Sequence, residues 1–156
     1  MHPSLDEEMR DGRRFMRAAL TEGRKALPDC LPNPPVGCVL VKGEQIIASG
    51  YTRVPGQQHA EAMALSKVSG NLSDVSAYVT LEPCSFFGRT PSCAKALIDR
   101  GISRVFVATL DPDPRNSGAG IKLLESAGIV VEIGMLEKEA LEELRMYLAG
   151  RTGEKY

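Results

Sequence analysis

The sequence has few of the features that mark membrane, secreted or nucleic-acid-binding proteins. No uninterrupted apolar run approaches the ~20 residues of a membrane span, and the first residues show neither the basic nor the apolar segment of a secretion signal. The formal net charge of −1 gives no global attraction for nucleic acid or an anionic membrane. Internal repeats and low-complexity tracts are also absent. These absences predict a cytoplasmic protein that binds neither nucleic acid nor membrane.

The composition is that of an ordinary globular protein. The chain has 156 residues, of which 43% are hydrophobic and 25% are charged. This length is enough for one well-buried core and too short for a second domain of ordinary size. We therefore expect residues 1–156 to form one domain.

The sequence contains only four cysteines, and a reducing compartment favours metal binding over disulfides among them. Cys38 lies in an apolar run, residues 36–41, which favours a buried inert thiol. Cys30 has no evident role. Cys84 and Cys93 remain as the pair with a chemical function.

Hydrophobic periodicity predicts alternating strands and helices after an opening hairpin. The expected helices span residues 5–23, 59–69, 93–100, 121–127 and 136–148. The expected strands span residues 36–42, 45–51, 77–81, 104–110 and 129–133, and the first two form the hairpin. This order predicts an α/β protein, a three-layer α/β/α sandwich with a mixed sheet of about five strands.

One imidazole, one carboxylate and two thiols form a candidate zinc site. His59 and Glu61 are expected in the first turn of a helix, and Cys84 and Cys93 near another helix start, where α/β sheets bind ligands. Three protein ligands leave the fourth tetrahedral position of zinc open, as in catalytic sites. We predict one Zn²⁺ per chain on His59, Cys84 and Cys93. Glu61 is expected to take a proton from water and return it to the leaving group.

His-x-Glu followed by Pro-Cys and a further Cys is the signature of the zinc deaminases of nucleobases. This chain has His59-Ala60-Glu61 and Pro83-Cys84, but eight residues rather than two separate Cys84 from Cys93. A purely structural zinc site, or buried thiols without metal, is the alternative. A structural site normally closes with four ligands and would not need an acid at position 61.

The long cysteine spacing supports a closer resemblance. Residues 80–85, Thr-Leu-Glu-Pro-Cys-Ser, with Gly-Arg-Thr-Pro at 88–91 and then Cys93, resemble the deaminase domain of the bifunctional riboflavin-biosynthesis deaminase/reductase, in the cytidine-deaminase-like superfamily. Further landmarks that match are Pro32-Asn33-Pro34, Val36-Gly37-Cys38, Asp111-Pro112 with Pro114, and Gly118-Ala119-Gly120. The resemblance implies a cytidine-deaminase-like fold and a zinc deaminase acting on a diaminopyrimidinone that carries a ribosylamino phosphate. It also implies that Asn33 hydrogen-bonds the substrate.

Three positions depart from the family pattern. Phe86 and Thr52 stand where the family usually has histidines, and Asp113 stands where it has asparagine. The run 50–53 looks closer to fungal deaminases of the same pathway, which act on a ribitylamino form. Loss of a hydrogen-bonding group typically costs about 10⁴-fold against a substrate that needs it. An alternative substrate is therefore another amino-heterocycle, such as a free base, a nucleoside or a pterin-like ring.

The predicted substrate contacts come from the loops around the zinc site. A guanidinium beside backbone N–H groups at a helix start can bind a phosphate, so Arg115 is the predicted phosphate contact. The alternative is that Arg115 is a solvated loop residue and Asn116 only caps the helix. Phe86 is expected to form a wall of the ring pocket. The complete predicted set is Asn33, Ala60, Phe86, Arg89, Thr90, Arg115 and Asn116.

Two other function classes remain open. One is a zinc-stabilised non-catalytic subunit, which would not need Glu61. The other is a transfer-RNA-editing enzyme, which requires a basic surface and usually has the two-residue cysteine spacing, and this chain has neither. The arginines at 10–17 could form an RNA-binding stripe, but their pattern is typical of a solvated helix face. The expected partners are a small aminopyrimidine or related heterocycle, further copies of the chain in a dimer or tetramer, and a separate reductase in the pathway.

Overall fold

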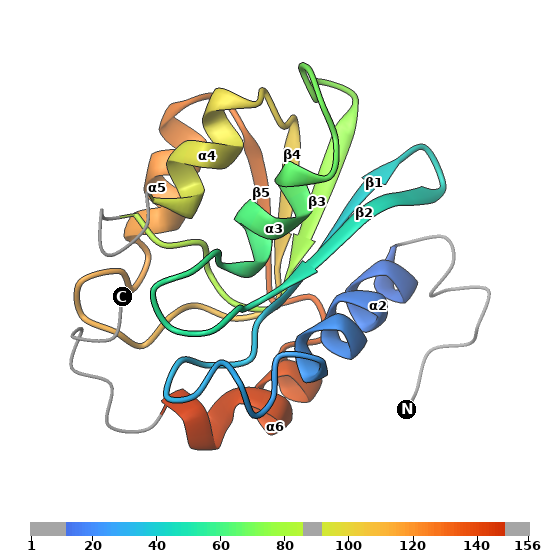
Figure 1. Cartoon of the computed structure of the whole chain (residues 1–156). Coiled ribbons are helices and arrows are strands. Elements are labelled where there is room, and N and C mark those ends of the chain that lie inside the picture. Colours follow the sequence, from blue (N-terminus) through green and yellow to red (C-terminus); the bar gives the residue numbers. More distant parts are fainter. Residues whose placement is uncertain (1–11, 86–91, 149–156) are drawn as a thin grey trace, which may run out of the picture.

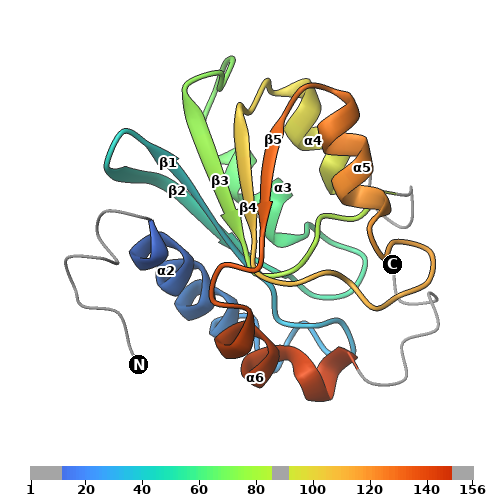
Figure 2. The ribbon, with the colours of Figure 1, turned by 180° about the vertical axis from the view of Figure 1, so that it is seen from behind.

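The structure, a computed structural model, describes residues 12–85 and 92–148 and shows a sheet between two layers of helices (Figures 1 and 2). The described elements are, in chain order, α2 (Arg13–Arg24), β1 (Gly37–Lys42), β2 (Gln45–Tyr51), α3 (Ala60–Ser66), β3 (Val75–Val79), α4 (Cys93–Asp99), β4 (Arg104–Val107), α5 (Ala119–Ser126), β5 (Val130–Ile133) and α6 (Glu137–Leu148). In these two ranges no helix combines the length and apolarity needed to cross a bilayer.

The sheet is mixed and has five strands in the order β2-β1-β3-β4-β5. β1 pairs antiparallel with β2, as the predicted hairpin, and also antiparallel with β3. β3, β4 and β5 are parallel, so α4 and α5 are the crossover connections between them. The predicted three-layer α/β/α sandwich with a mixed sheet of five strands is confirmed.

Alternating side chains divide the core between the two faces of the sheet. In β3 and β4, Ala77, Val79 and Val107 belong to the cluster that α3, α4 and α5 cover, and this cluster also reaches the end of α6. Tyr78 and Phe106 point to the opposite face, toward α2 and α6. Figures 1 and 2 show these two helical layers on either side of the strands. The strand period of two therefore decides which residues can lie near the candidate site.

Two strands differ from the predicted boundaries by more than one residue. The apolar run at 77–81 predicted a later strand than β3, and the run at 104–110 predicted a longer strand than β4. Val79 is the last β3 residue paired with β1 and with β4, because the chain then leaves the sheet toward Cys84. The predicted first helix, 5–23, runs through Gly12, but Gly12 is the N-cap of α2 with a left-handed φ of 86°, so α2 begins at Arg13; residues 5–11 lie outside the described ranges.

Candidate active site

His59 lies immediately before α3 and is its N-cap residue, with extended backbone angles of φ −77° and ψ 171°. α3 packs very close to β2 at Gly50. A Cβ at Gly50 would lie 2.2 Å from the Ala60 carbonyl oxygen and 2.6 Å from the Ala64 nitrogen. Only glycine allows this approach, so the sequence of β2 fixes where α3 begins and where His59 stands.

The two cysteines are joined through the start of α4. Cys84 lies in the loop after β3, and Cys93 is the first residue of α4. The Ser92 hydroxyl donates to the Cys84 carbonyl at 2.8 Å and accepts from the Lys95 N–H at 3.2 Å, which caps the helix. The Ala94 N–H donates to the same Cys84 carbonyl at 3.0 Å, and the Cys93 N–H donates to Cys84 Sγ at 3.2 Å.

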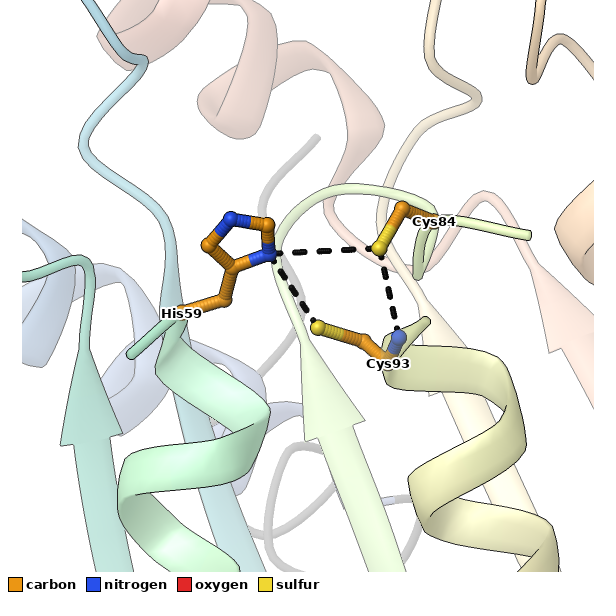
Figure 3. Close-up of side chains that lie close together, drawn as sticks. All are labelled: His59, Cys84 and Cys93. Atoms are coloured by element: carbon orange, nitrogen blue, oxygen red, sulfur yellow. Dashed lines mark hydrogen bonds between the residues drawn. The ribbon is translucent and has the colours of Figure 1, made fainter. Parts of the chain in front are cut away.

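The side chains of His59, Cys84 and Cys93 converge on one point (Figure 3). His59 Nδ1 lies 3.2 Å from Cys93 Sγ and 3.9 Å from Cys84 Sγ. The three candidate ligand atoms all lie within 4.8 Å of one another. Ligand atoms on a tetrahedral zinc, at Zn–N and Zn–S distances of about 2.0 and 2.3 Å, lie about 3.5–3.8 Å apart. The donor set and its spacing therefore fit Zn²⁺.

Glu61 lies in the first turn of α3 and is only 4% exposed. The pKa of its carboxyl is raised to about 7, chiefly by burial and also by the negative charge of Cys84, although His59 and hydrogen bonds from the backbone and from Cys93 act in the opposite direction. Glu61 is therefore a buried acid beside the three candidate ligands. A buried carboxyl with a pKa of about 7 can exchange a proton at such a site.

The two thiols divide one negative charge unequally. The pKa of Cys84 is lowered, chiefly by a hydrogen bond from the Cys93 thiol and also by His59, although burial opposes this shift. The pKa of Cys93 is raised well above its usual value, because Cys93 gives its hydrogen bond to Cys84 and is buried. One thiolate therefore forms readily, and a cation bound by His59, Cys84 and Cys93 would favour ionisation of the second thiol.

The chain matches a known family over most of its length. The model of the cytidine and deoxycytidylate deaminase zinc-binding region matches residues 9–109, a span that contains His59, Glu61, Cys84 and Cys93. The chain belongs to this deaminase family.

Relatives within the family carry riboflavin-biosynthesis names. The chain is 47% identical over 138 residues to the riboflavin biosynthesis protein RibD of Chlamydia pneumoniae, covering 88% of this chain and 37% of that protein. It is 44% identical over 109 residues to the diaminohydroxyphosphoribosylamino-pyrimidine deaminase of Buchnera aphidicola, covering 70% of this chain and 74% of that one.

A solved structure of Acinetobacter baumannii RibD superimposes with a TM-score of 0.85 at 40% identity, over 90% of this chain and 40% of that one. The chain therefore spans about two fifths of the length of the RibD proteins that it matches.

The structure describes the surroundings of four of the predicted substrate contacts. Asn33 lies in the loop before β1, is 9% exposed, and donates its backbone N–H to the Cys30 carbonyl at 2.8 Å. Ala60 is fully buried at the start of α3, directly after His59. Arg115 lies in the loop before α5, and its side chain is 41% exposed. As substrate contacts, these residues remain predictions.

Asn116 is 1% exposed, and its amide bonds the loop that carries Cys84. It donates to the Pro83 carbonyl at 3.2 Å and accepts from the Ser85 N–H at 3.1 Å. As a substrate contact Asn116 also remains a prediction, while these bonds show that it holds the loop around Cys84. Phe86, Arg89 and Thr90, the remaining predicted contacts, lie outside the described residues.

Two positions that depart from the riboflavin-type pattern have local partners. Thr52 is buried and its hydroxyl accepts from the Val36 N–H at 3.1 Å, which ties the end of β2 to the loop before β1. Asp113 is fully buried and accepts from the Arg115 N–H at 2.9 Å, with the Arg115 guanidinium 3.4 Å away. Each residue therefore stabilises a loop at the site edge of the sheet.

Sequence analysis missed Glu82, which immediately precedes Pro83-Cys84. It is 3% exposed and surrounded by backbone N–H groups from the loop before α5. The available signal was an acidic residue inside the otherwise apolar stretch that leads to Cys84. The other two cysteines are fully buried free thiols, and burial raises the pKa of both Cys30 and Cys38, as expected for inert core residues.

Proposed function

We propose that the protein is a zinc-dependent hydrolytic deaminase of riboflavin biosynthesis. Its substrate is a diaminopyrimidinone that carries a ribosylamino or ribitylamino phosphate, from which it releases one exocyclic ring amine as ammonia. The observation that carries this proposal is the convergence of His59, Cys84 and Cys93 beside the buried Glu61. The similarity to one protein named as the diaminohydroxyphosphoribosylamino-pyrimidine deaminase, and to others named for riboflavin biosynthesis, supports the choice of substrate.

The reaction exchanges a ring C–N bond for a C–O bond. When bound, zinc supplies a Lewis acid at the edge of the sheet and lowers the pKa of water there. Glu61 accepts a proton as water adds to the amino-bearing ring carbon, and returns it to the departing amine, so that ammonia leaves and the ring carries a carbonyl. Because Glu61 is buried, bulk water does not compete with this transfer.

The substrate lies between the loop before β1 and the loop before α5. Asn33 hydrogen-bonds the ring from the first loop, and Ala60 borders it from the start of α3. Arg115 pairs with the phosphate, because its guanidinium is partly exposed beside the start of a helix. Phe86, Arg89 and Thr90 would complete the pocket in this proposal.

Ammonia release tests the proposal directly. Zinc-loaded protein, with its metal content measured, is incubated with the ribosylamino and ribitylamino phosphates of the diaminopyrimidinone. Cytidine, dCMP, guanine and a pterin serve as competing substrate classes. We expect ammonia from at least one of the two phosphates, with kcat/KM at least about 100-fold above that for the other classes.

Two outcomes of this substrate panel would contradict the proposal. Ammonia from a free base, nucleoside or pterin alone would replace the proposed substrate but keep the chemistry. Silence from protein that contains one zinc per chain would contradict the catalytic proposal and favour a non-catalytic subunit. Glu61→Gln is the matched negative control, because it keeps the size of the side chain and removes the proton carrier.

The proposed assembly is a homodimer or homotetramer, and a reductase is expected to act on the deaminated product. The similarity to a Thermotoga maritima protein named as both a deaminase and a uracil reductase supports the second proposal. Sedimentation of the zinc-loaded protein would measure the oligomeric state. A sedimentation coefficient of the monomer at micromolar concentration would contradict the first of them.

A further inference from the structure

The buried carboxylate of Glu82 is held entirely by backbone N–H groups from the next crossover. Its Oε1 accepts from the N–H of Asp111 at 3.1 Å and of Gly118 at 3.0 Å. Its Oε2 accepts from the N–H of Gly120 at 2.9 Å and of Ile121 at 3.2 Å. Gly118 is the N-cap of α5, so the negative charge also lies at the positive end of a helix of eight residues. We refer to Glu82 and these four N–H groups as the carboxylate clamp.

The clamp holds the first residues of the loop that carries Cys84. The Glu82 N–H donates to the Thr109 carbonyl at 3.0 Å, so backbone and side chain of Glu82 both bond the region after β4. The next residue, Pro83, is packed against α5. A Cβ at Gly120 would lie 2.0 Å from the Pro83 carbonyl oxygen, so only glycine permits this contact.

Asn116 holds the loop on both sides of Cys84. Its amide donates to the carbonyl of Pro83 and accepts from the N–H of Ser85, at 3.2 and 3.1 Å. The backbone around Cys84 is therefore held by two segments. Asn116, in the loop before α5, bonds the two neighbours of Cys84, and Ser92, at the start of α4, bonds the Cys84 carbonyl. The Cys84 Sγ has little freedom to move relative to His59 Nδ1, 3.9 Å away.

We propose that Glu82 is a positioning residue for the metal centre: through the carboxylate clamp it sets the place of Cys84 relative to His59 and Cys93. Glu82 does not contact the reacting atoms, because its two oxygens already accept four N–H groups and its side chain is buried. The inference rests on the proposed zinc site but not on the proposed substrate. Groups that orient metal ligands in this way typically change metal affinity or activity by about 10- to 100-fold when removed.

The clamp also links the metal centre to the loop that carries Arg115. Asp111 and Gly118, at the two ends of this loop, bond the same Glu82 oxygen. Displacement of Glu82 should therefore move the candidate phosphate-binding loop together with Cys84. A defect in the clamp is expected to lower kcat through the metal centre and to raise KM through this loop.

Glu82→Gln is the sharpest test. The substitution preserves size but places an NH₂ donor against two backbone N–H donors and removes the charge. We expect zinc affinity, measured by competition with a chromophoric chelator, to fall about 10- to 100-fold. The cobalt-substituted variant should also show weakened and shifted thiolate-to-cobalt absorption. The matched control is Glu125→Gln, the same change on an exposed residue of α5, which should match the unchanged protein in both measurements.

Asn116→Leu is the second variant, because it removes the bonds to Pro83 and Ser85 without changing charge in the core. We expect the same direction of change with a smaller effect, about 3- to 10-fold in zinc affinity. If Glu82→Gln does not fold, Glu82→Asp decides the question, because it keeps the charge but is one methylene too short to reach all four N–H groups, and the same loss of zinc affinity is expected. Folded variants whose zinc affinity lies within twofold of the unchanged protein, with an unaltered cobalt spectrum, would overturn the inference.

These readouts separate the inference from the proposed function. If the unchanged protein binds zinc tightly but releases no ammonia, the proposed substrate or reaction fails while the affinity comparison still stands. If the clamp variants deaminate more slowly but bind zinc normally, Glu82 acts elsewhere and the positioning role fails.

Discussion

The two faces of the sheet are built from different residues. The buried cluster under α3, α4 and α5 is aliphatic, with no aromatic ring among its described residues, and it includes the fully buried Ala60, Ala64, Ala77 and Ala94. The opposite face is aromatic. Tyr78 and Phe106 stack with centroids 4.3 Å apart and planes 5° from parallel, and Phe15 packs on Tyr78 at 5.3 Å.

The two faces therefore have different roles: one positions the candidate metal ligands, and the other mainly buries apolar surface. Gly50 lets the start of α3 approach β2 closely, and His59 there lies with its Nδ1 3.2 Å from Cys93 Sγ. The aromatic face contains no candidate ligand among the described residues and contributes mainly buried area. Substitutions on the first face should therefore change catalysis more than stability, and substitutions on the second face should do the reverse.

The largest expected effect is that of Glu61→Gln. Loss of a positioned acid–base group typically costs about 10²- to 10⁴-fold, and we expect kcat to fall by that amount. The zinc content and the melting temperature should stay near those of the unchanged protein, because the side chain keeps its size. Steady-state ammonia release and metal analysis measure both. Retained turnover in the glutamine variant would remove Glu61 from the mechanism.

Gly50→Ala tests the close approach of α3. The added methyl group would meet backbone atoms of Ala60 and Ala64, so α3 must shift and carry His59 with it. A displacement of about 1 Å can cost about 10²-fold in rate, and we expect kcat/KM to fall about 10- to 100-fold. Ser66→Ala, at the exposed end of α3, is the control. Wild-type kcat/KM in the Gly50 variant would show that the start of α3 tolerates movement.

Phe106→Leu should have the opposite profile. It removes half of the stacked pair on the aromatic face, and we expect the free energy of unfolding to fall by about 1–2 kcal/mol. Below the melting temperature, kcat/KM should remain within twofold, because Phe106 lies on the side of the sheet away from the ligands. Urea unfolding of the zinc-loaded protein gives the first quantity. A large loss of kcat/KM would mean that the faces are not independent.

The smallest expected effect is that of Arg24→Gln. Arg24 Nε bonds Glu143 Oε1 at 2.8 Å and joins α2 to α6 at the surface. Both side chains are partly exposed, so the ion pair is expected to contribute at most about 1 kcal/mol to stability, and less at high salt. Thermal unfolding at low and high salt measures this contribution. A larger loss that is independent of salt would point to packing rather than charge.

The sequence predicted the elements well because their periodicity is local. The hairpin of β1 and β2, the crossover helices and the candidate ligands His59, Cys84 and Cys93 could all be inferred from residue type and spacing. Strand ends could not, because they depend on partners: Val75 joins β3 by pairing with Lys42, and β4 ends where Val107 pairs with Ile133.

The role of Glu82 could not be predicted for a similar reason. Its partners, from Asp111 to Ile121, lie 29 to 39 positions further along the chain. A local motif shows only an acid before Pro-Cys, and the fold alone brings the start of α5 to it. The same holds for Asn116, for which the sequence suggested a helix cap or a substrate contact rather than bonds to both neighbours of Cys84.

The carboxylate clamp should also be visible in amide hydrogen exchange. The first N–H groups of a helix and those of a loop normally have no acceptor in the chain and exchange rapidly with solvent. The amide protons of Asp111, Gly118, Gly120 and Ile121 instead share one buried carboxylate. They should exchange only when the central sheet opens, which would make the long loop before α5 part of the same cooperative unfolding unit as β3 and β4.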